Sequence, residues 1–373
     1  MSDLSSARRP RGIVKLNGVR IDAWVSWEVD NNAFYQADTF RALINVAELP
    51  AANDLSWIAA QEELDIEIFG GVPIDADNYS ESDLKSLFFG RVDSLDYDPV
   101  ARTIDLSGRD LTGLLTDAKT TESFSNQSST QIAQTLAGRH GLTAEIPQPT
   151  RVKVGAYYET QAVTLNHERT EWDLLTYLAN YEGFVIRVRG KTLYFGPAPD
   201  PEQSKYPIVW TAPSKPWETP TAPVTTLKLS HNLTLAKDVV VVFKGFDIKK
   251  HKPITVTVKK PRIRNSVTSS ASPLSGPAQV YTQFFYKPTT REVLLQKAQA
   301  FAQSVSAHEY RLSADMPADD VLDVITPVVL SGLGSPWDQT YFPDSIVRGM
   351  NRDDGYRMRL NAKNHSPEST VSA

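Results

Sequence analysis

Two His-Glu pairs are the first residues in this sequence whose types and spacing suggest chemistry. His167-Glu168 and His308-Glu309 begin like the helical zinc motif, in which a second histidine follows one turn after the first. The residues at that position are Glu171 and Leu312, so neither pair supplies the second imidazole that the metal requires. Neither pair therefore predicts a metal centre.

Other signatures of enzymes are missing from the sequence. It contains no glycine-rich phosphate loop, no dinucleotide fingerprint and no G-x-S-x-G nucleophile motif. The acidic stretch DADNYSESD, from Asp75 to Asp83, offers oxygen ligands but lacks the glycine and the spaced glutamate of a calcium loop, so we interpret it as a solvated loop. We assign no catalytic, cofactor-binding or metal-binding residue, and we expect the protein not to be an enzyme.

A basic stretch near the middle of the chain is a candidate for binding. Only Asp247 opposes its charge, and Ile254, Val256 and Val258 alternate within it as in a strand. One interpretation is a strand pair with a charged rim, since lysine at strand ends discourages aggregation. The other is contact with an acidic partner, either a protein or DNA. The basic residues are Lys244, Lys249, Lys250, Lys252, Lys259, Lys260, Arg262 and Arg264.

Length and composition set the wider limits. A chain of 373 residues with 41% hydrophobic content can bury more than one core, so we expect two or three domains. The absence of cysteine excludes a disulfide framework and thiolate metal sites, and it suits assembly in a reducing cytoplasm. The polar start MSDLSSARRPRG predicts no signal peptide, and no apolar run approaches the length of a membrane span. A net charge of -5 argues against a general nucleic-acid binder.

The elements that position these residues fall into three segments. Up to about residue 115, apolar and polar residues alternate in several short runs, and Gly108 is expected to break the last of them. This pattern predicts an antiparallel barrel or sandwich. The predicted strands contain Ile21 to Trp27, Phe40 to Val46, Leu64 to Ile68, Phe88 to Asp96 and Thr103 to Ser107.

The second segment, to about residue 215, predicts helices as well as strands. Ser128 with Gln131 and Thr170 with Asp173 have capping-box spacing, so each begins a helix. Trp172 lies on the apolar face of the second helix and is expected to anchor a core. A hairpin follows at residues 184–195, and the proline-rich stretch 197–223 is expected to lack regular structure.

Strands return in the third segment. They are predicted at Leu227 to Leu229, Val239 to Phe243 and Ile254 to Val258. Thr289 with Glu292 caps one helix, which carries Leu294, Ala298, Phe301 and Val305 at helical spacing; residues 266–276 are expected to form a loop. The final hairpin, residues 345–360, repeats the layout of residues 89–106.

Two longer motifs carry a family resemblance. SGRDLTGLL, followed by F-x-N-Q-S-S-T-Q-I-A-Q-T-L-A-G-R-H-G-L, is the first, and TEWDLLTYLANYEGFVIRVRGKTLYFGP, from Thr170 to Pro197, is the second. Both resemble the phage late control gene D family, whose members are baseplate hub proteins of contractile tails. The resemblance implies two similar barrels per chain, so that a trimer presents six barrels to a six-fold tail tube. Neither motif is catalytic, and both describe packing.

The resemblance and the residue patterns together predict a mainly β fold with an α+β insertion. Two similar antiparallel β-barrel domains of tail-tube type would be separated by a mixed α/β middle domain. We place the first barrel at residues 1–115, the middle domain at 116–215, and the second barrel, with one packed helix and a polar C-terminal tail, at 216–373.

The expected function is that of a structural baseplate hub in the virion tail, assembled in the host cytoplasm. A homotrimeric ring would adapt the tail tube, or its initiator, to a spike protein below, contact other baseplate proteins, and let DNA pass without binding it specifically. We expect no cofactor and no stable membrane insertion. A channel that bound DNA tightly would stall ejection, so the basic stretch Lys244 to Arg264 is expected outside the channel.

Two alternatives stay open at this stage. The first is a hub that also degrades cell wall, although the tail NAKNHSPESTVSA after Leu360 is too short and polar to be a fused enzyme. The second is the hub of a tailocin or a type VI-like injection machine. The absence of a long β-helical extension argues against a spike fused to this chain.

Overall fold

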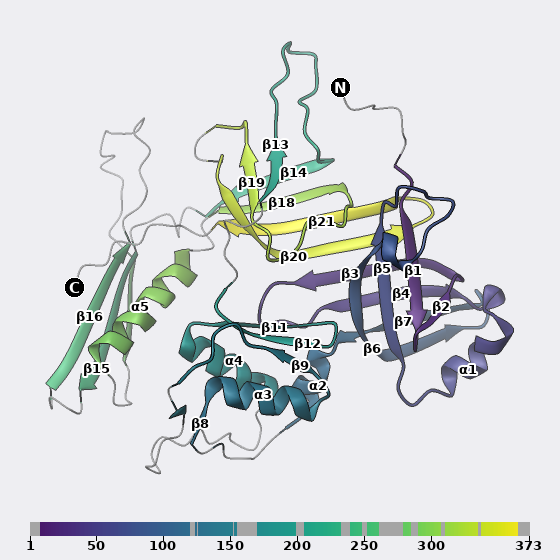
Figure 1. Cartoon of the computed structure of the whole chain (residues 1–373). Coiled ribbons are helices and arrows are strands. Elements are labelled where there is room, and N and C mark those ends of the chain that lie inside the picture. The colour runs from purple at the N-terminus through teal and green to yellow at the C-terminus, as the bar shows by residue number, and fades with distance from the viewer. Residues whose placement is uncertain are drawn as a thin grey trace. The chain divides into compact units, whose positions relative to one another are not determined.

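The computed structural model describes residues 8–119, 124, 126–151, 153–154, 170–198, 205–232, 239–247, 252–260, 279–284, 290–306, 310–334 and 337–364 (Figure 1). These residues divide into two compact units. The first unit comprises Met1–Asp200, Met316–Ile325 and Ser345–Arg359, and the second comprises Pro201–Asp315, Thr326–Asp344 and Leu360–Ala373. No helix in the described ranges is long and apolar enough to cross a membrane.

Antiparallel strands form the larger sheet of the first unit. Inward positions alternate along them, as at Trp27 and Val29 in one strand and at Ile104 and Leu106 in another, and all four side chains are buried. The strand order is β20-β3-β4-β7-β6-β5-β1-β2. The strands are β1 (Arg11–Leu16), β2 (Val19–Ile21), β3 (Trp24–Asn32), β4 (Thr39–Asn45), β5 (Asp65–Gly71), β6 (Lys85–Asp98), β7 (Thr103–Asp110) and the part of β20 (Thr340–Asn351) that begins at Ser345; the short helix α1 (Leu55–Ala59) joins β4 to β5.

The expected break at Gly108 was wrong, because β7 continues through Gly108 to Asp110. The register between β6 and β7 shifts between Val92 and Ser94, opposite this glycine. A Cβ at Gly108 would lie 2.1 Å from the carbonyl oxygen of Arg91. Glycine therefore permits the close approach of a bulged strand here, which is a role of glycine inside sheets.

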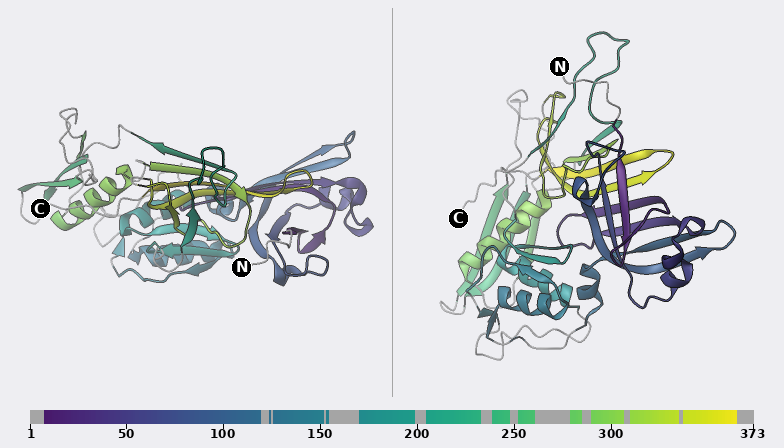
Figure 2. Two further views of the ribbon diagram at one scale, coloured as in Figure 1. Left: turned by 90° about the horizontal axis from the view of Figure 1, so that it is seen from above. Right: turned by 45° about the vertical axis from the view of Figure 1, so that its right-hand side comes forward.

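The mixed part of the first unit confirms the two predicted helix starts. Ser128 with Gln131 and Thr170 with Asp173 form complete capping boxes, and Gly183 ends the second helix at φ 73°. The helices α3 and α4 lie side by side against a small sheet with the order β11-β12-β9 (Figure 2). The elements are α2 (Thr112–Asp117), β8 (Gln127–Ser128), α3 (Ser129–Arg139), β9 (Thr143–Glu145), β10 (Lys153–Val154), α4 (Glu171–Glu182), β11 (Val185–Arg189) and β12 (Thr192–Gly196).

Trp172 is part of the core of this region, as predicted. Its side chain is 7% exposed and belongs to a cluster of buried apolar residues from α3, α4, β11 and β12. Leu136 and Leu175 in the same cluster are fully buried. The apolar stripes that the sequence places on the two helices therefore face each other and the sheet.

In the second unit, the proline-rich stretch contains a strand that the sequence did not predict. β13 (Tyr206–Val209) pairs in parallel with β19 (Val328–Ser331), and Ile208 is fully buried. Within the described ranges β13 pairs with β19 alone, so Pro207 does not interrupt a second ladder. The other strands of this unit are β14 (Thr226–His231), β18 (Tyr310–Pro317) up to Asp315, β20 up to Asp344, and β21 (Gly355–Asn364) from Leu360. β14 pairs with β18, and β19 with β20, both antiparallel.

A separate three-stranded layer carries the predicted helix of the third segment. Its order is β16 (Lys252–Lys260), β15 (Val239–Asp247) and β17 (Gln279–Phe284), and α5 (Arg291–Ser306) covers one face. Leu294 and Ala298 of the predicted apolar stripe pack on buried residues of β15 and β16, as does Ala302, and Phe301 is partly buried against them. The side chain of Val305 lies outside the described residues. Thr289 and the loop 266–276 lie outside the described residues.

The prediction of a mainly β chain with a mixed α/β part is confirmed. The hairpin predicted near the end of the chain is also present, as β20 and β21. The similarity of the two strand-rich segments, and the domain limits at residues 115 and 215, stay predictions.

Candidate functional site, a buried polar junction

The turn between β3 and β4 is held against the mixed part of the first unit by three hydrogen bonds around Tyr35. Its backbone N–H donates to the carbonyl of Ile186 at 3.1 Å, and its hydroxyl donates to the carbonyl of Phe184 at 2.6 Å. The indole Nε1 of Trp172 donates to the carbonyl of Tyr35 at 3.2 Å. Burial raises the pKa of the Tyr35 hydroxyl to about 12, so the hydroxyl stays a donor at neutral pH.

Tyr35 adopts a left-handed backbone conformation, with φ 75°. Such a conformation costs a residue with a side chain on the order of 1–3 kcal/mol. Each of the three hydrogen bonds contributes about 0.5–1.5 kcal/mol, so together they offset the strain. The turn is therefore fixed by its contacts and not by its own backbone preference.

A chain of buried polar groups begins at Asp38, at the end of the same turn. Its carboxylate accepts hydrogen bonds from the backbone N–H of Asn32 at 2.7 Å and from Nδ2 of Asn31 at 2.9 Å. Asn31 also donates to the carbonyl of Leu87 at 3.0 Å, and its Oδ1 accepts from Nη1 of Arg348 at 3.3 Å. One asparagine thus connects β3 to β6 and to β20.

Arg348 extends this chain to the segment that follows β18. Its Nε donates to the carbonyl of Asp319 at 3.0 Å, and its Nη2 donates to the carbonyl of Leu322. The side chain is 3% exposed and forms no ion pair within the described ranges. Burial lowers the pKa of the guanidinium, although an arginine remains charged near neutrality. The charge is stabilised by carbonyl and amide oxygens.

Asp110, at the end of β7, lies beside Asp38. Its backbone N–H donates to the carbonyl of Asp38 at 2.9 Å, and its carboxylate accepts from the backbone N–H of Thr112 at 3.0 Å. Burial, with the nearby charge of Asp38, raises the pKa of Asp110 to about 8. Asp38 keeps some solvent exposure, but burial still raises its pKa to about 6. Asp110 is therefore mostly protonated at pH 7.

A group of charged residues forms the other side of the junction. Lys85 Nζ donates to the carbonyl of Asp320 at 2.8 Å and lies 4.0 Å from the carboxylate of Asp323, which also pairs with Arg189 of β11. Burial raises the pKa of Asp323, but the charges of Arg189 and Lys85 outweigh it and hold the pKa below its usual value. These contacts join β6, β11 and residues 319–323.

This arrangement suits a structural joint better than a reaction site. The pocket beside Asp38 and Asp110 measures about 30 Å³ and is walled by Phe89 and residues 188–190. Binding sites for small ligands typically measure about 300–1,000 Å³, so this one holds a water at most. We interpret the junction as a clamp that fixes the β3–β4 turn, β11, residues 319–323 and β20 in one arrangement.

Sequence reasoning missed the junction although a signal was present. Asp110 was interpreted only as part of the motif SGRDLTGLL. In β20, however, Arg348 occupies the same face as Ile346 and Met350, which are buried. A charged residue at an inward position of an alternating strand indicates a buried polar partner, because an unpaired buried charge is too costly.

The residues considered for metal binding have other roles or lie outside the described ranges. His167, Glu168, His308 and Glu309 are all outside. Glu171 is 2% exposed and pairs with Arg139 and His140 at 2.6 Å each, which ties the end of α3 to the start of α4.

In the acidic loop, the carboxylates bind the protein itself. Asp75 accepts from the backbone N–H groups of Asp77 and Asn78, and Asp83 completes a capping box with Ser80. Glu81 pairs with Lys15 at 3.0 Å. Among the described residues, no group of three or more potential metal ligands occurs.

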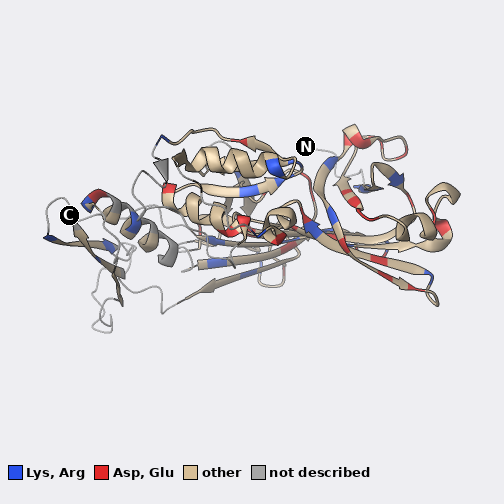
Figure 3. Cartoon of the chain, turned by 90° about the horizontal axis from the view of Figure 1, so that it is seen from below, with Lys and Arg blue, Asp and Glu red and all other residues tan. Residues whose placement is uncertain are grey.

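The described part of the basic stretch forms an antiparallel strand pair, β15 with β16, which agrees with the first of the two interpretations. Lys244 and Lys259 are exposed on β15 and β16, and Lys252 begins β16. Figure 3 marks the Lys and Arg positions of the described residues in blue. Lys244 Nζ lies 5.4 Å from the ring centroid of Phe284 on β17, a cation–π distance. Lys249, Lys250, Arg262 and Arg264 lie outside the described residues.

Solved structures share this arrangement of elements over nearly their whole length. A tail protein from Neisseria meningitidis MC58 superposes with a TM-score of 0.67 at 15% identity, covering 95% of this chain and 96% of that chain. The 43 kDa tail protein of prophage MuSo2 from Shewanella oneidensis gives 0.66 at 15% identity, covering 95% and 98%. The chain has the fold of phage tail proteins.

A component of the type VI secretion system of E. coli is also similar, with a TM-score of 0.55 at 9% identity over 96% of this chain and 79% of that chain. No family model matches the sequence, and no curated protein matches it. The phage-tail fold that the two motifs implied is therefore confirmed at the level of structure.

A prediction about pH follows from Asp110. Below its ordinary pKa of 3.8 the carboxyl is protonated in both the folded and the unfolded chain. As the pH rises towards 8, the unfolded chain loses this proton while the folded chain keeps it, so the free energy of unfolding should fall by about 1.4 kcal/mol per pH unit. Asp110→Asn should remove this contribution, which urea unfolding at pH 5 and pH 8 would measure.

The matched control for this experiment is Asp353→Asn, in the exposed turn between β20 and β21. It should leave the difference between the two pH values unchanged. An equal pH dependence in wild type and Asp110→Asn would show that Asp110 titrates normally.

Proposed function

We propose that this chain is a structural baseplate hub of a contractile phage tail, of the late control gene D type. The observation that carries the proposal is the similarity to two tail proteins over at least 95% of this chain and of each of them. The two sequence motifs, which resemble that family, lie on β7 to α3 and on α4 to β12. Both contribute buried residues to the core around Trp172.

In this proposal three copies form a closed ring. A six-fold tube that ends on a single spike needs an adaptor, and two tube-like barrels in each of three chains provide six positions. Head-to-tail contacts that close on themselves produce such rings. The ring seats the tube or its initiator above and the spike below, and DNA passes through it without specific binding.

The buried polar junction is suited to a protein that must withstand mechanical force. Contraction of a tail puts force on its hub, so the β3–β4 turn and the mixed part of the first unit must move together. Buried polar networks fix one arrangement, because any other leaves charged or polar groups unpaired. We propose no hydrolase activity and no cofactor, and we place the protein in the virion tail after assembly in the host cytoplasm.

A type VI or tailocin hub is the second candidate, supported by the similarity to the E. coli secretion component. The two candidates share the ring and differ in what the ring is attached to. Isolation of the particle that contains this chain distinguishes them, since a phage particle carries a DNA-filled head.

The ring predicts a mass of three chains for the purified protein in solution, about three times 41.4 kDa. Native mass spectrometry or light scattering measures it, and a cryo-EM map of the tail should show three copies between tube and spike. Each contact should bury roughly 2,000 Å² or more, as permanent interfaces do. Six copies in the map, or the side chains of Lys252 and Lys259 lining the bore, would contradict this proposal.

A further inference from the structure

A tryptophan projects into solvent from a stiff loop of the second unit. Trp217 lies in the loop between β13 and β14, and its side chain is 79% exposed. Figure 1 shows this loop extending beyond β13. Thr211 and Thr221 exchange two backbone hydrogen bonds, of 2.8 and 3.0 Å, at the base of the loop. Pro213, Pro216 and Pro220 restrict the backbone between them. An indole held out on a stiffened loop loses little conformational freedom when it binds.

Charged neighbours surround this indole. Lys215 Nζ lies 5.7 Å from the centroid of the Trp217 ring. The carboxylate of Glu218 accepts a hydrogen bond from the hydroxyl of Ser214 at 2.5 Å, lies 3.8 Å from Lys215 Nζ in a surface ion pair, and remains 39% exposed. The tip of the loop therefore presents an aromatic ring with a carboxylate beside it.

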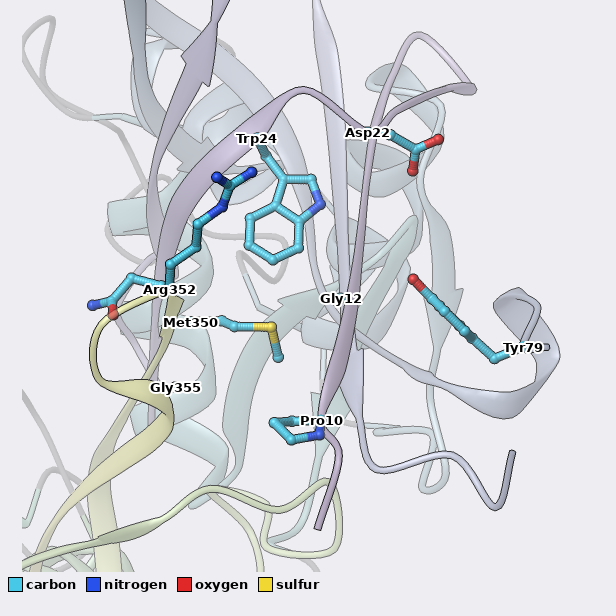
Figure 4. Close-up of a pocket in the computed structure, with 9 residues that line it drawn as sticks. Pro10, Gly12, Asp22, Trp24, Tyr79, Met350, Arg352 and Gly355 are labelled. Carbon is cyan, nitrogen blue, oxygen red and sulfur yellow. The ribbon is translucent and has the colours of Figure 1, made fainter. Parts of the chain in front are cut away.

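The first unit contains a pocket of about 320 Å³ that has the complementary character (Figure 4). Trp24, Met350 and Arg352 point toward one another on one side of the strand that carries Gly12. Gly12 adds no side chain, and a Cβ there would lie 2.9 Å from Trp27 Nε1 and 3.3 Å from Met350 Sδ. The strand at Gly12 therefore packs closely on Trp27 and Met350, and a larger residue there would displace them. The other lining residues are Pro10, Asp22, Tyr79, Asn351 and Gly355.

Arg352 provides a positive charge at this pocket. It lies in the turn between β20 and β21, is exposed, and forms no hydrogen bond or ion pair in the described part of the chain. The carboxylate of Asp22, by contrast, is paired with Arg20 at 2.7 Å. A partner that inserts an apolar ring beside a carboxylate would therefore meet the side chains of Trp24 and Met350 and an available guanidinium in a lining that is otherwise mixed in polarity.

The size of the pocket also favours a single large side chain. Its volume of about 320 Å³ is large enough for one indole ring with its methylene group. It lies at the lower end of the range for small-molecule sites, about 300–1,000 Å³. Tryptophan in a pocket is a common anchor of protein interfaces.

We propose that Trp217 of one copy of this chain inserts into the pocket of a second copy, with Glu218 facing Arg352. The loop and the pocket are different surfaces of the same chain, as a head-to-tail contact requires. Three equal contacts of this kind would close the ring. The inference rests on the proposed trimer and names the residues that hold it.

Cross-linking tests this contact directly. The natural chain has no cysteine, so Glu218→Cys combined with Arg352→Cys creates one defined pair while Trp217 is kept. A bismaleimide that spans a Glu–Arg contact should join the chains into covalent dimers and trimers. The control pair, Glu218→Cys with Val100→Cys, uses a residue that is 92% exposed in the turn between β6 and β7 and should yield no trimer.

Separate outcomes distinguish this contact from the proposed function. If wild type has the mass of a trimer but the first pair does not cross-link, or cross-links within one chain, the contact is wrong and the hub proposal stands. If wild type is a monomer at high concentration, the hub proposal itself fails.

Charge reversal and truncation provide a second test. Glu218→Arg and Arg352→Glu should each weaken the trimer, and the double variant should recover much of its stability. Trp217→Ala should weaken each contact by roughly 30-fold or more, as the loss of an anchor residue does. Its melting temperature as a monomer should match wild type. A trimer that survives Trp217→Ala, with lost binding to tube or spike protein, would assign the loop to another partner.

Discussion

Replacing Trp172 with alanine should lower the free energy of unfolding by about 3 to 5 kcal/mol, the range for truncation of a large buried aromatic side chain. The ring is 7% exposed within the core of α3, α4, β11 and β12, and its Nε1 donates to the carbonyl of Tyr35. The change therefore removes apolar burial and one of the three hydrogen bonds of the β3–β4 turn. Denaturant unfolding monitored by circular dichroism measures the loss.

Two further variants separate the causes. Trp172→Phe keeps most of the ring but removes the donor, so it should cost about 1 kcal/mol more than the packing change alone. Val100→Ala is the control, since truncation of a side chain that is 92% exposed in the turn between β6 and β7 should leave stability nearly unchanged. An unchanged melting temperature for Trp172→Ala, together with failed tail assembly, would instead place Trp172 at an interface.

Arg348→Met should destabilise the protein by about 3 kcal/mol, although methionine fills much of the same volume. The guanidinium supplies hydrogen bonds to Asn31 Oδ1 and to the carbonyls of Asp319 and Leu322. Each acceptor that is left buried without a donor costs on the order of 1–3 kcal/mol, and the relief of a buried charge offsets part of the total. Thermal unfolding and denaturant titration both report the difference.

Arg357→Met is the control for this variant. Its guanidinium pairs with Asp354 on the surface, with 68% of the side chain exposed, and such pairs contribute about 0–1 kcal/mol. A stability of Arg348→Met equal to that of Arg357→Met would show that water replaces the lost donors, and that the junction does not fix the arrangement of these strands.

Local signals in the sequence predicted the helices of the mixed part well. The starts of α3 and α4 depend on residues three positions apart, and their ends depend on glycines in the left-handed conformation, Gly141 at φ 69° and Gly183 at φ 73°. Such signals need no information about distant parts of the chain. The alternating strands of the first unit were predicted for the same reason.

The missed elements depend on partners far away in the sequence. β13 forms because Ile208 is buried where this strand pairs with β19. β17 forms because it pairs in parallel with β15, a strand that lies far before it in the sequence. Gly108 was interpreted as a break because the residues around it do not reveal that the backbone of Arg91 lies close to it in the neighbouring strand. The junction was missed because Asn31 and Arg348 meet only after the fold is complete.

The pairing of β3 with β20 has a consequence for biosynthesis. Asn32 lies opposite Ser345, so one edge of β3 has no permanent partner until the ribosome has added roughly 300 further residues, which takes on the order of 15 to 60 s at ~5–20 residues per second. During that time the nascent chain exposes a strand edge, which is a template for wrong pairing. A chain terminated before residue 345 would keep that edge open, and would therefore aggregate or be degraded before it could enter a tail.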